Sequence, residues 1–152
     1  MSKTFRVEAW SHAVEEMKPL FPDHWEDVAV NKDKIKLAMD YDRYDQLEKA
    51  AVLHLVVARD DGKVFGYFCL IISKHLHYRD TLMAASDFYY IKPEYRNPSN
   101  AALLFEAAER TLKERGVVYV AATTKVHKDK GKFLEYMGWK NTERQYTKYL
   151  GE

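Results

Sequence analysis

Residues 83–105 read MAASDFYYIKPEYRNPSNAALLF, and this stretch leads from a strand through a polar turn into a helix. The apolar and aromatic run over residues 83–91 predicts the strand, and Pro93 and Pro98 punctuate the loop over 92–100. Apolar residues at helical spacing then predict a helix over residues 101–115, which Gly116 ends. The start of a helix presents unpaired N–H groups and a partial positive charge, so this turn suits a phosphate.

The remaining elements follow from hydrophobic periodicity and turn residues. Asp61 and Gly62 lie between two β-rich runs, which is a strong hairpin signal. A strand on each side of the 101–115 helix implies locally parallel pairing, so the sheet is mixed and the class is α/β. We predict strands over residues 5–10, 54–59, 64–72 and 117–123, and one or two further strands within 139–150. We predict helices over residues 11–20, where Ser11 is the cap, 40–51 and 130–137, and a polar connection over 73–81.

Composition limits the class of protein. A chain of 152 residues, 47% hydrophobic and 31% charged, is expected to be one globular domain over residues 1–152. Lys+Arg 24 against Asp+Glu 23 leaves a net charge of +1, which argues against general nucleic-acid binding. The single cysteine, Cys69, excludes an intramolecular disulfide and fits a cytoplasmic location. We expect no membrane segment, because no 18-residue apolar run exists, and no metal site, because the histidines lack ligand spacing.

Residues 96–101 read RNPSNA and resemble the pyrophosphate loop of the GNAT superfamily of acyl-CoA N-acyltransferases, Gln/Arg-x-x-Gly-x-Gly/Ala. Arg96 and Ala101 match the first and last positions. Ser99 stands where the central glycine is expected, and Pro98 removes one N–H. The resemblance extends over the whole chain and implies a single-domain, mostly antiparallel, splayed sheet of six or seven strands, flanked by about four helices.

Within the superfamily, the chain is most similar to a group of small phage-encoded proteins, which implies the cytoplasm of a bacterial host. This likeness lies in five stretches: 23–29 (DHWEDVA), 41–44 (YDRY), 77–79 (HYR), 87–96 (DFYYIKPEYR) and 146–150 (YTKYL).

The resemblance also implies acetyl-CoA as co-substrate and assigns its contacts. The strand before the loop would pair its backbone with the pantetheine arm through Tyr89, Tyr90 and Ile91. Pyrophosphate contacts would fall on Arg96 and on the backbone of Asn97, Ser99, Asn100 and Ala101. A basic group, Lys125, Lys128, Lys130 and Lys132, is expected to be a solvated face or a contact for the adenosine 3′-phosphate.

Transfer to an amine needs a base, and Asp87, beside the pantetheine positions, is our first candidate. His127 is the second catalytic candidate, at the position of a family asparagine. Leu134 stands at the position of the family's acid tyrosine, while Tyr136 lies two residues away and is expected to point elsewhere. Residues expected at the acceptor site are His24, Trp25, Tyr44, His77 and Tyr78.

The leading hypothesis is therefore transfer of an acetyl group from acetyl-CoA to an amine by direct attack. The acceptor stays open between a small amine, a protein lysine or N-terminus, and a modified base. The main alternative is a catalytically degenerate GNAT fold that binds a host or partner factor, which Pro98, Ser99 and the missing tyrosine favour. A module for another phosphate ligand is a third hypothesis, and the exposed edges of a small splayed sheet make a homodimer plausible.

Overall fold

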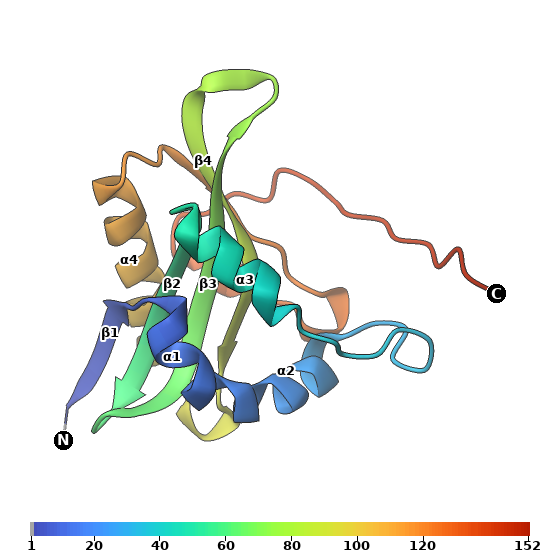
Figure 1. The fold of residues 1–152 in the computed structure, drawn as a ribbon, viewed down its shortest axis with the longest axis horizontal. Coiled ribbons are helices and arrows are strands. Elements are labelled where there is room, and N and C mark those ends of the chain that lie inside the picture. Colours follow the sequence, from blue (N-terminus) through green and yellow to red (C-terminus); the bar gives the residue numbers. More distant parts are fainter. Residues whose placement is uncertain (1) are drawn as a thin grey trace.

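The structure, a computed structural model, describes residues 2–152 and is built around a five-stranded sheet (Figure 1). The strands lie in chain order, and every neighbouring pair is antiparallel except the last, β4 with β5. Their bounds are β1 Lys3–Val7, β2 Leu53–Asp60, β3 Lys63–His75, β4 Tyr78–Ile91 and β5 Tyr119–Ala121. The predicted α/β class and mixed, mostly antiparallel sheet are confirmed, with five strands among the described residues instead of six or seven.

Helices cover both faces of the sheet (Figure 1). One face packs against α1 to α3, and the other against α4, which connects β4 to the parallel strand β5. The α-helices are α1 Trp10–Met17, α2 Phe21–Val28, α3 Tyr41–Lys49, α4 Pro98–Glu114 and α5 Gly131–Tyr136, and the 3-10 turns are η1 Lys18–Leu20, η2 Pro93–Tyr95 and η3 Val126–Lys128. Helix α4 therefore begins three residues earlier than predicted, because Pro98 is favourable in the first turn of a helix.

The Asp61–Gly62 hairpin is confirmed. Asp60 pairs with Lys63, and both turn residues have positive φ, 49° for Asp61 and 82° for Gly62, as a type I′ turn requires. The connection expected over residues 73–81 is instead mostly strand, since β3 and β4 continue to a hairpin tip that projects beyond the rest of the sheet (Figure 1).

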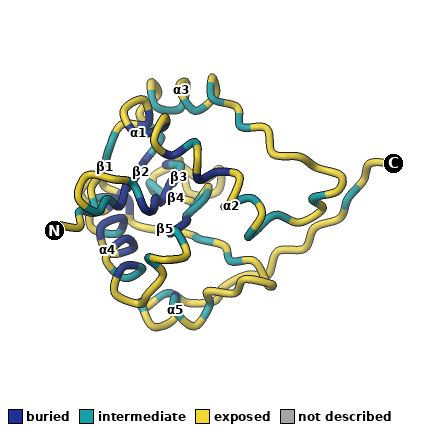
Figure 2. The backbone as a smooth tube through the Cα atoms, turned by 90° about the horizontal axis from the view of Figure 1, so that it is seen from below, coloured by how far each residue is buried: buried dark blue, intermediate teal, exposed yellow. Residues whose placement is uncertain are grey.

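The interior has two separate apolar clusters, one on each face. Leu70, Leu104 and Leu112 belong to the cluster under α4, whereas Trp10 and Tyr67 belong to the cluster under α1 to α3. Figure 2 shows the buried backbone concentrated on the strands and on the inner side of α4, with the surrounding segments exposed. At roughly 25 cal/mol per Å² of apolar surface removed from water, this burial on both faces is the main stabilising term.

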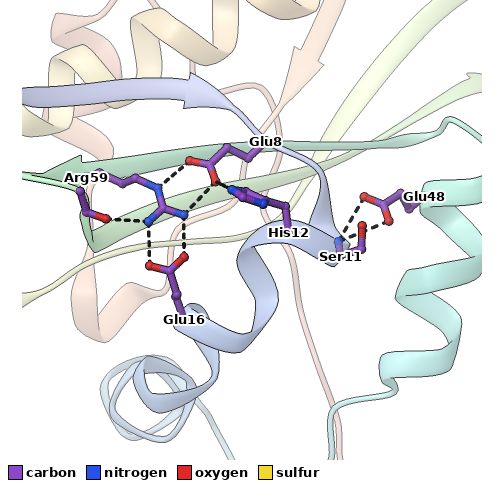
Figure 3. A network of polar contacts seen from close by, with 7 residues as sticks. Glu8, Ser11, His12, Glu16, Glu48 and Arg59 are labelled. Atoms are coloured by element: carbon purple, nitrogen blue, oxygen red, sulfur yellow. Dashed lines mark hydrogen bonds and ion pairs between the residues drawn. The ribbon is translucent and has the colours of Figure 1, made fainter.

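Helix α1 is tied to its neighbours by charged side chains (Figure 3). The Arg59 guanidinium on β2 donates to Glu8 and to Glu16 at 2.7–2.9 Å, and this double pairing raises the pKa of Arg59. The N–H of Ser11 donates to the Glu48 carboxylate of α3 at 3.3 Å. The predicted cap was wrong: the cap position is Ala9, and a distant carboxylate, not the Ser11 side chain, accepts from the first turn.

On the opposite face, His54 joins β2 to α4. Its Nε2 lies 2.8 Å from the Thr111 hydroxyl and its Nδ1 lies 3.1 Å from the Arg115 guanidinium. The side chain is only 1% exposed, and burial, followed by the Arg115 charge, lowers the pKa of His54 to about 4. His54 is therefore neutral near pH 7 and serves as a hydrogen-bonding link within the core.

The strands predicted over residues 139–150 do not form. This segment has no regular structure and runs away from the sheet as an exposed arm (Figure 1). The Lys34 ammonium lies 4.8 Å from the ring centre of Tyr149, so the arm meets the segment between α2 and α3. A strand needs a partner along its whole length, and β5 is only three residues long. None of the helices in residues 2–152 has the length and apolar character needed to span a bilayer.

Candidate functional site

A cavity of about 640 Å³ opens where β4 and β5 separate. The two strands pair only through residues 83–85 of β4, although β4 continues to Ile91. Beyond Ala85, the edge of β4 therefore borders the cavity instead of another strand. Tyr89, Tyr90 and Ile91, the residues predicted to contact a pantetheine arm, all line this cavity.

A β-bulge directs Asp87 into the cavity. Cys69 pairs with Phe88 and Leu70 with Ser86, so Asp87 is the extra residue on β4. The bulge also reverses the alternation of the strand: Ala84 packs in the α4 cluster, whereas Phe88 and Tyr90 pack in the cluster under α1 to α3. Because of this extra residue, Asp87 and Phe88 both face the α1 to α3 side, which two adjacent residues of a regular strand cannot do.

Asp87 accepts a short hydrogen bond from the hydroxyl of Tyr44 on α3. Burial, and next this carboxylate, raise the pKa of Tyr44 well above its ordinary value, so Tyr44 stays a neutral donor. Its ring stacks on buried Trp10 with centroids 4.3 Å apart, which holds the hydroxyl in place. Tyr44 thus contacts Asp87 but is not itself a lining residue of the cavity.

Aromatic rings form the floor of the cavity on the α2 side. His24 stacks on Tyr90 at 4.8 Å, and its Nδ1 lies 3.0 Å from the Tyr67 hydroxyl. Phe88 meets Tyr67 edge to face at 5.3 Å. Burial lowers the pKa of His24 to about 4, so the imidazole is neutral near pH 7. This floor is aromatic, and its polar groups are the neutral imidazole and the tyrosine hydroxyls.

The turn before α4 is internally hydrogen-bonded. The Asn97 side chain accepts from the Asn100 N–H at 2.8 Å, and the Asn97 carbonyl accepts from the Ala101 N–H at 3.2 Å. Asn100 is buried and its side chain donates to the Tyr95 carbonyl. Of the predicted pyrophosphate contacts, Arg96, Asn97 and Ala101 line the cavity, while Ser99 and Asn100 do not. The turn therefore offers fewer free N–H donors than its sequence position suggests.

Arg96 is held at the mouth of the cavity by three contacts. It donates to the Asp27 carboxylate at 2.6 Å and to the Ile91 carbonyl at 2.8 Å, and its guanidinium lies 5.2 Å from the centre of the Tyr90 ring. The hydrogen bond from Arg96 holds the pKa of Asp27 below its usual value. Asp27 was not predicted as a site residue, since it lies 69 residues away from Arg96 in the sequence.

Three lysines add positive charge to the same cavity. Lys125, Lys128 and Lys130 follow β5 and line it together with Arg96. Burial, and next the charges of Arg96 and Lys128, lower the pKa of Lys130. This donor set suits a ligand with several negative charges, as phosphates carry. The described residues contain no group of three or more His, Cys, Asp or Glu placed to hold a metal ion.

The end of β4 is held close to β3 at Gly66. A Cβ atom on Gly66 would lie 2.9 Å from the Tyr90 carbonyl oxygen and 3.2 Å from the Ile91 side chain. Only glycine fits such a close approach of two strands. Gly66 therefore helps to position the two residues of β4 that border the cavity.

Several predicted residues are not brought to the cavity. His77 and Tyr78 lie in the exposed tip of the β3–β4 hairpin, nine residues or more from Asp87, which is about 30 Å of extended strand. His127 is exposed beside the cavity, with its Nε2 3.2 Å from the Asp27 carbonyl oxygen, and is not a lining residue. Leu134 is buried in the α4 cluster. Tyr136 is 82% exposed and outside the cavity, as expected.

Comparison with known proteins identifies the family of this chain. The sequence profile described as the Acetyltransferase (GNAT) family matches residues 10–139. The chain therefore belongs to the GNAT acetyltransferase family. No curated protein matches it in sequence.

Solved structures share the fold at low sequence identity. An aminoglycoside N-acetyltransferase in complex with CoA is 17% identical, with 97% of this chain and 94% of that chain covered and a TM-score of 0.74. Glucosamine-6-phosphate N-acetyltransferase from Arabidopsis thaliana is 15% identical, with coverages of 99% and 100% and a TM-score of 0.73. Ribosomal-protein-alanine N-acetyltransferase from Brucella melitensis biovar Abortus 2308 is 14% identical, with coverages of 99% and 100% and a TM-score of 0.72. The names of these three proteins give different acceptors, so the likeness defines the fold and not the substrate.

Proposed function

We propose that this protein transfers an acetyl group from acetyl-CoA to an amine by direct attack. The observation that carries the proposal is the free edge of β4 from the bulged Asp87 to Ile91, which borders one cavity together with Arg96 in the turn before α4. An edge of this kind offers backbone groups to an extended, amide-containing arm, as a strand does to its neighbour. The family, and a fold neighbour solved with CoA, support the same co-substrate.

The residues at the α4 end fit a coenzyme with several phosphates. Arg96, Lys125, Lys128 and Lys130 would hold the phosphate groups as charged donors. The N–H group of Asn97, which lines the cavity, has no acceptor among the described residues and would complete this donor set. Arg96 would exchange Asp27 for a phosphate oxygen, and charge–charge attraction therefore compensates for the missing glycine of the loop.

Asp87 is the base in this proposal. Acetyl-CoA supplies a thioester, whose C–S bond breaks as the amine nitrogen forms the new C–N bond. Asp87 attracts the protonated amine and takes the proton whose loss frees the nitrogen lone pair, while Tyr44 keeps the carboxylate oriented. The second proton that the nitrogen loses, after the C–N bond has formed, passes to water. A thiol with an ordinary pKa of about 8.5 leaves readily as thiolate, so the chemistry does not require an acid at the position of Leu134.

Binding of the co-substrate is the first test. We expect acetyl-CoA to bind the purified chain in calorimetry and to raise its melting temperature, with a much smaller effect from ADP. A ligand at about 100 times its dissociation constant stabilises the native state by roughly 2.7 kcal/mol. Absence of binding at millimolar acetyl-CoA would contradict the proposal.

Arg96→Gln tests the phosphate contact. We expect the dissociation constant for CoA to rise about 10- to 100-fold, because hydrogen bonds to charged groups contribute roughly 1.5–3 kcal/mol each. Arg110→Gln is the matched control, since Arg110 lies on the helix that follows Arg96, is exposed and pairs with Glu114 among the described residues. Equal affinities of the two variants for CoA would show that Arg96 does not contact the coenzyme.

A further inference from the structure

The cavity has an apolar wall on the side of α2. Phe21, Trp25 and Val28 come from α2, Leu37 and Met39 come from the segment between α2 and α3, and Phe88 comes from β4. We call these six residues the α2 wall. Leu37 is 39% exposed, while Trp25 and Met39 are half-buried. Side chains of this kind lose contact with water when an apolar ligand covers them, which favours binding.

The cavity offers one carboxylate to a cationic acceptor. The charged lining residues are Asp27, Asp87, Arg96, Lys125, Lys128 and Lys130, and the four cations among them are the groups proposed above to hold the coenzyme phosphates. Asp27 is already paired with Arg96, and Lys128 lies close enough to lower the pKa of Asp27 further. Asp87 is the one lining carboxylate that is not paired with a cation. A ligand with one positive charge matches this arrangement, and a ligand with several does not.

We propose that the acceptor is a small primary amine with a single positive charge, carried on an apolar body the size of an aromatic ring. This proposal rests on the acetyl-transfer function proposed above and narrows its substrate. The ammonium lies against Asp87, and the apolar body lies against the α2 wall. On reaction, the ammonium gives one proton to Asp87, and the neutral nitrogen attacks the acetyl carbon. The C–S bond breaks as the amide C–N bond forms, the coenzyme sulfur leaves as thiolate, and the second proton that the nitrogen loses passes to water.

Acceptor preference can be measured by thiol release with acetyl-CoA and the full chain. The apolar probes are tryptamine and 2-phenylethylamine, and the polycationic probes are spermidine and kanamycin. We expect kcat/KM for the apolar amines to exceed that for the polycations by at least about tenfold, the gain from burying roughly two methylene-sized groups. The reverse order, with CoA binding intact, would overturn this inference and leave the proposed function standing. Absence of CoA binding would overturn both.

Variants of the α2 wall locate the acceptor. Leu37→Ser and Trp25→Ala should each raise KM for tryptamine by about tenfold while leaving the dissociation constant for CoA unchanged. Ile35→Ser is the matched control, because Ile35 lies in the same segment, is 53% exposed and does not line the cavity. An unchanged KM in the first two variants would place the acceptor elsewhere and contradict the inference.

Leu37→Asp adds a carboxylate to the α2 wall and separates charge from shape. We expect kcat/KM for tryptamine to fall and kcat/KM for spermidine to rise, because the added charge attracts a second ammonium.

The α2 wall could also contact a longer acyl chain, so acetyl-CoA and hexanoyl-CoA are compared directly. The acceptor proposal would be overturned if hexanoyl-CoA bound more tightly and reacted faster than acetyl-CoA, and if Leu37→Ser reduced both advantages. The α2 wall would then contact the acyl group.

Discussion

Each face of the sheet buries one histidine, and the two side chains have different surroundings. His54 lies between β2 and α4, bonded to Thr111 and Arg115, in a face whose core is closed by a long helix. His24 lies on the opposite face among aromatic rings and lines the cavity. Burial lowers both pKa values to about 4. We therefore expect substitutions beneath α4 to lower stability and substitutions beneath α2 to lower function.

The largest expected effect is on the cavity side, in Asp87→Asn. Loss of the proposed base should lower kcat about 10²- to 10⁴-fold with little change in melting temperature, since asparagine can still accept from Tyr44. Steady-state kinetics and thermal unfolding measure the two quantities. Asp80→Asn, in the exposed hairpin tip, is the control. Full activity of Asp87→Asn would assign this carboxylate to structure alone.

On the α4 face, Leu112→Ala should act on stability. Leu112 is 2% exposed within the α4 cluster and does not line the cavity. Its truncation leaves a void in the core, which should lower the free energy of unfolding by about 2–5 kcal/mol. Leu103→Ala on the same helix is the control, because Leu103 is 42% exposed. Chemical denaturation measures both. A loss of CoA affinity in Leu112→Ala without a loss of stability would break the contrast between the two faces.

The two histidines predict how stability depends on pH. Their folded pKa values of about 4 lie below the unfolded value of 6.5, so the unfolded chain binds more protons between these limits. Stability is therefore fully present above about pH 6.5 and falls as the pH drops toward 4, by up to about 1.4 kcal/mol per pH unit for each histidine. Asp27 and Glu16, whose pKa values are lowered, contribute losses below this window, while the raised pKa of Glu109 acts in the opposite sense.

Denaturation midpoints at pH 7 and pH 5 test this dependence. His24→Gln and His54→Gln should each reduce the difference in unfolding free energy between the two pH values. His12→Gln is the control, because the side chain of His12 is 72% exposed. A pH dependence that neither buried-histidine variant alters would show that other groups control it.

The smallest expected effect is in Asp27→Asn, on the cavity side. Removing this carboxylate frees Arg96 for a phosphate, so CoA should bind up to about fivefold more tightly. This factor corresponds to the small free energy that a partly exposed ion pair contributes. Asp23→Asn, exposed on the same helix, is the control. Calorimetry measures the change. Weaker binding in Asp27→Asn would mean that Asp27 positions Arg96 instead of competing for it.

Local patterns predicted much of the fold. The Asp61–Gly62 turn, the strand ending at Ile91 and the helix that follows Arg96 all form near their predicted positions. Their signals lie within a few residues of one another, in turn chemistry and hydrophobic period. The errors occurred where a distant partner is needed: the terminal strands found none, and the first turn of α1 is bound by Glu48.

Short-range spacing in the sequence was sufficient to predict the class of fold, the turn before α4 that contains Arg96, and the candidate site residues Asp87 and Tyr90. The tertiary structure alone decided the orientation of Asp87, which depends on how β4 registers against β3. It also decided the pairing of Arg96 with Asp27 and the α2 wall, since both join segments far apart in the chain. Chemistry at a site depends on which groups meet across such distances, and packing of the whole chain brings them together.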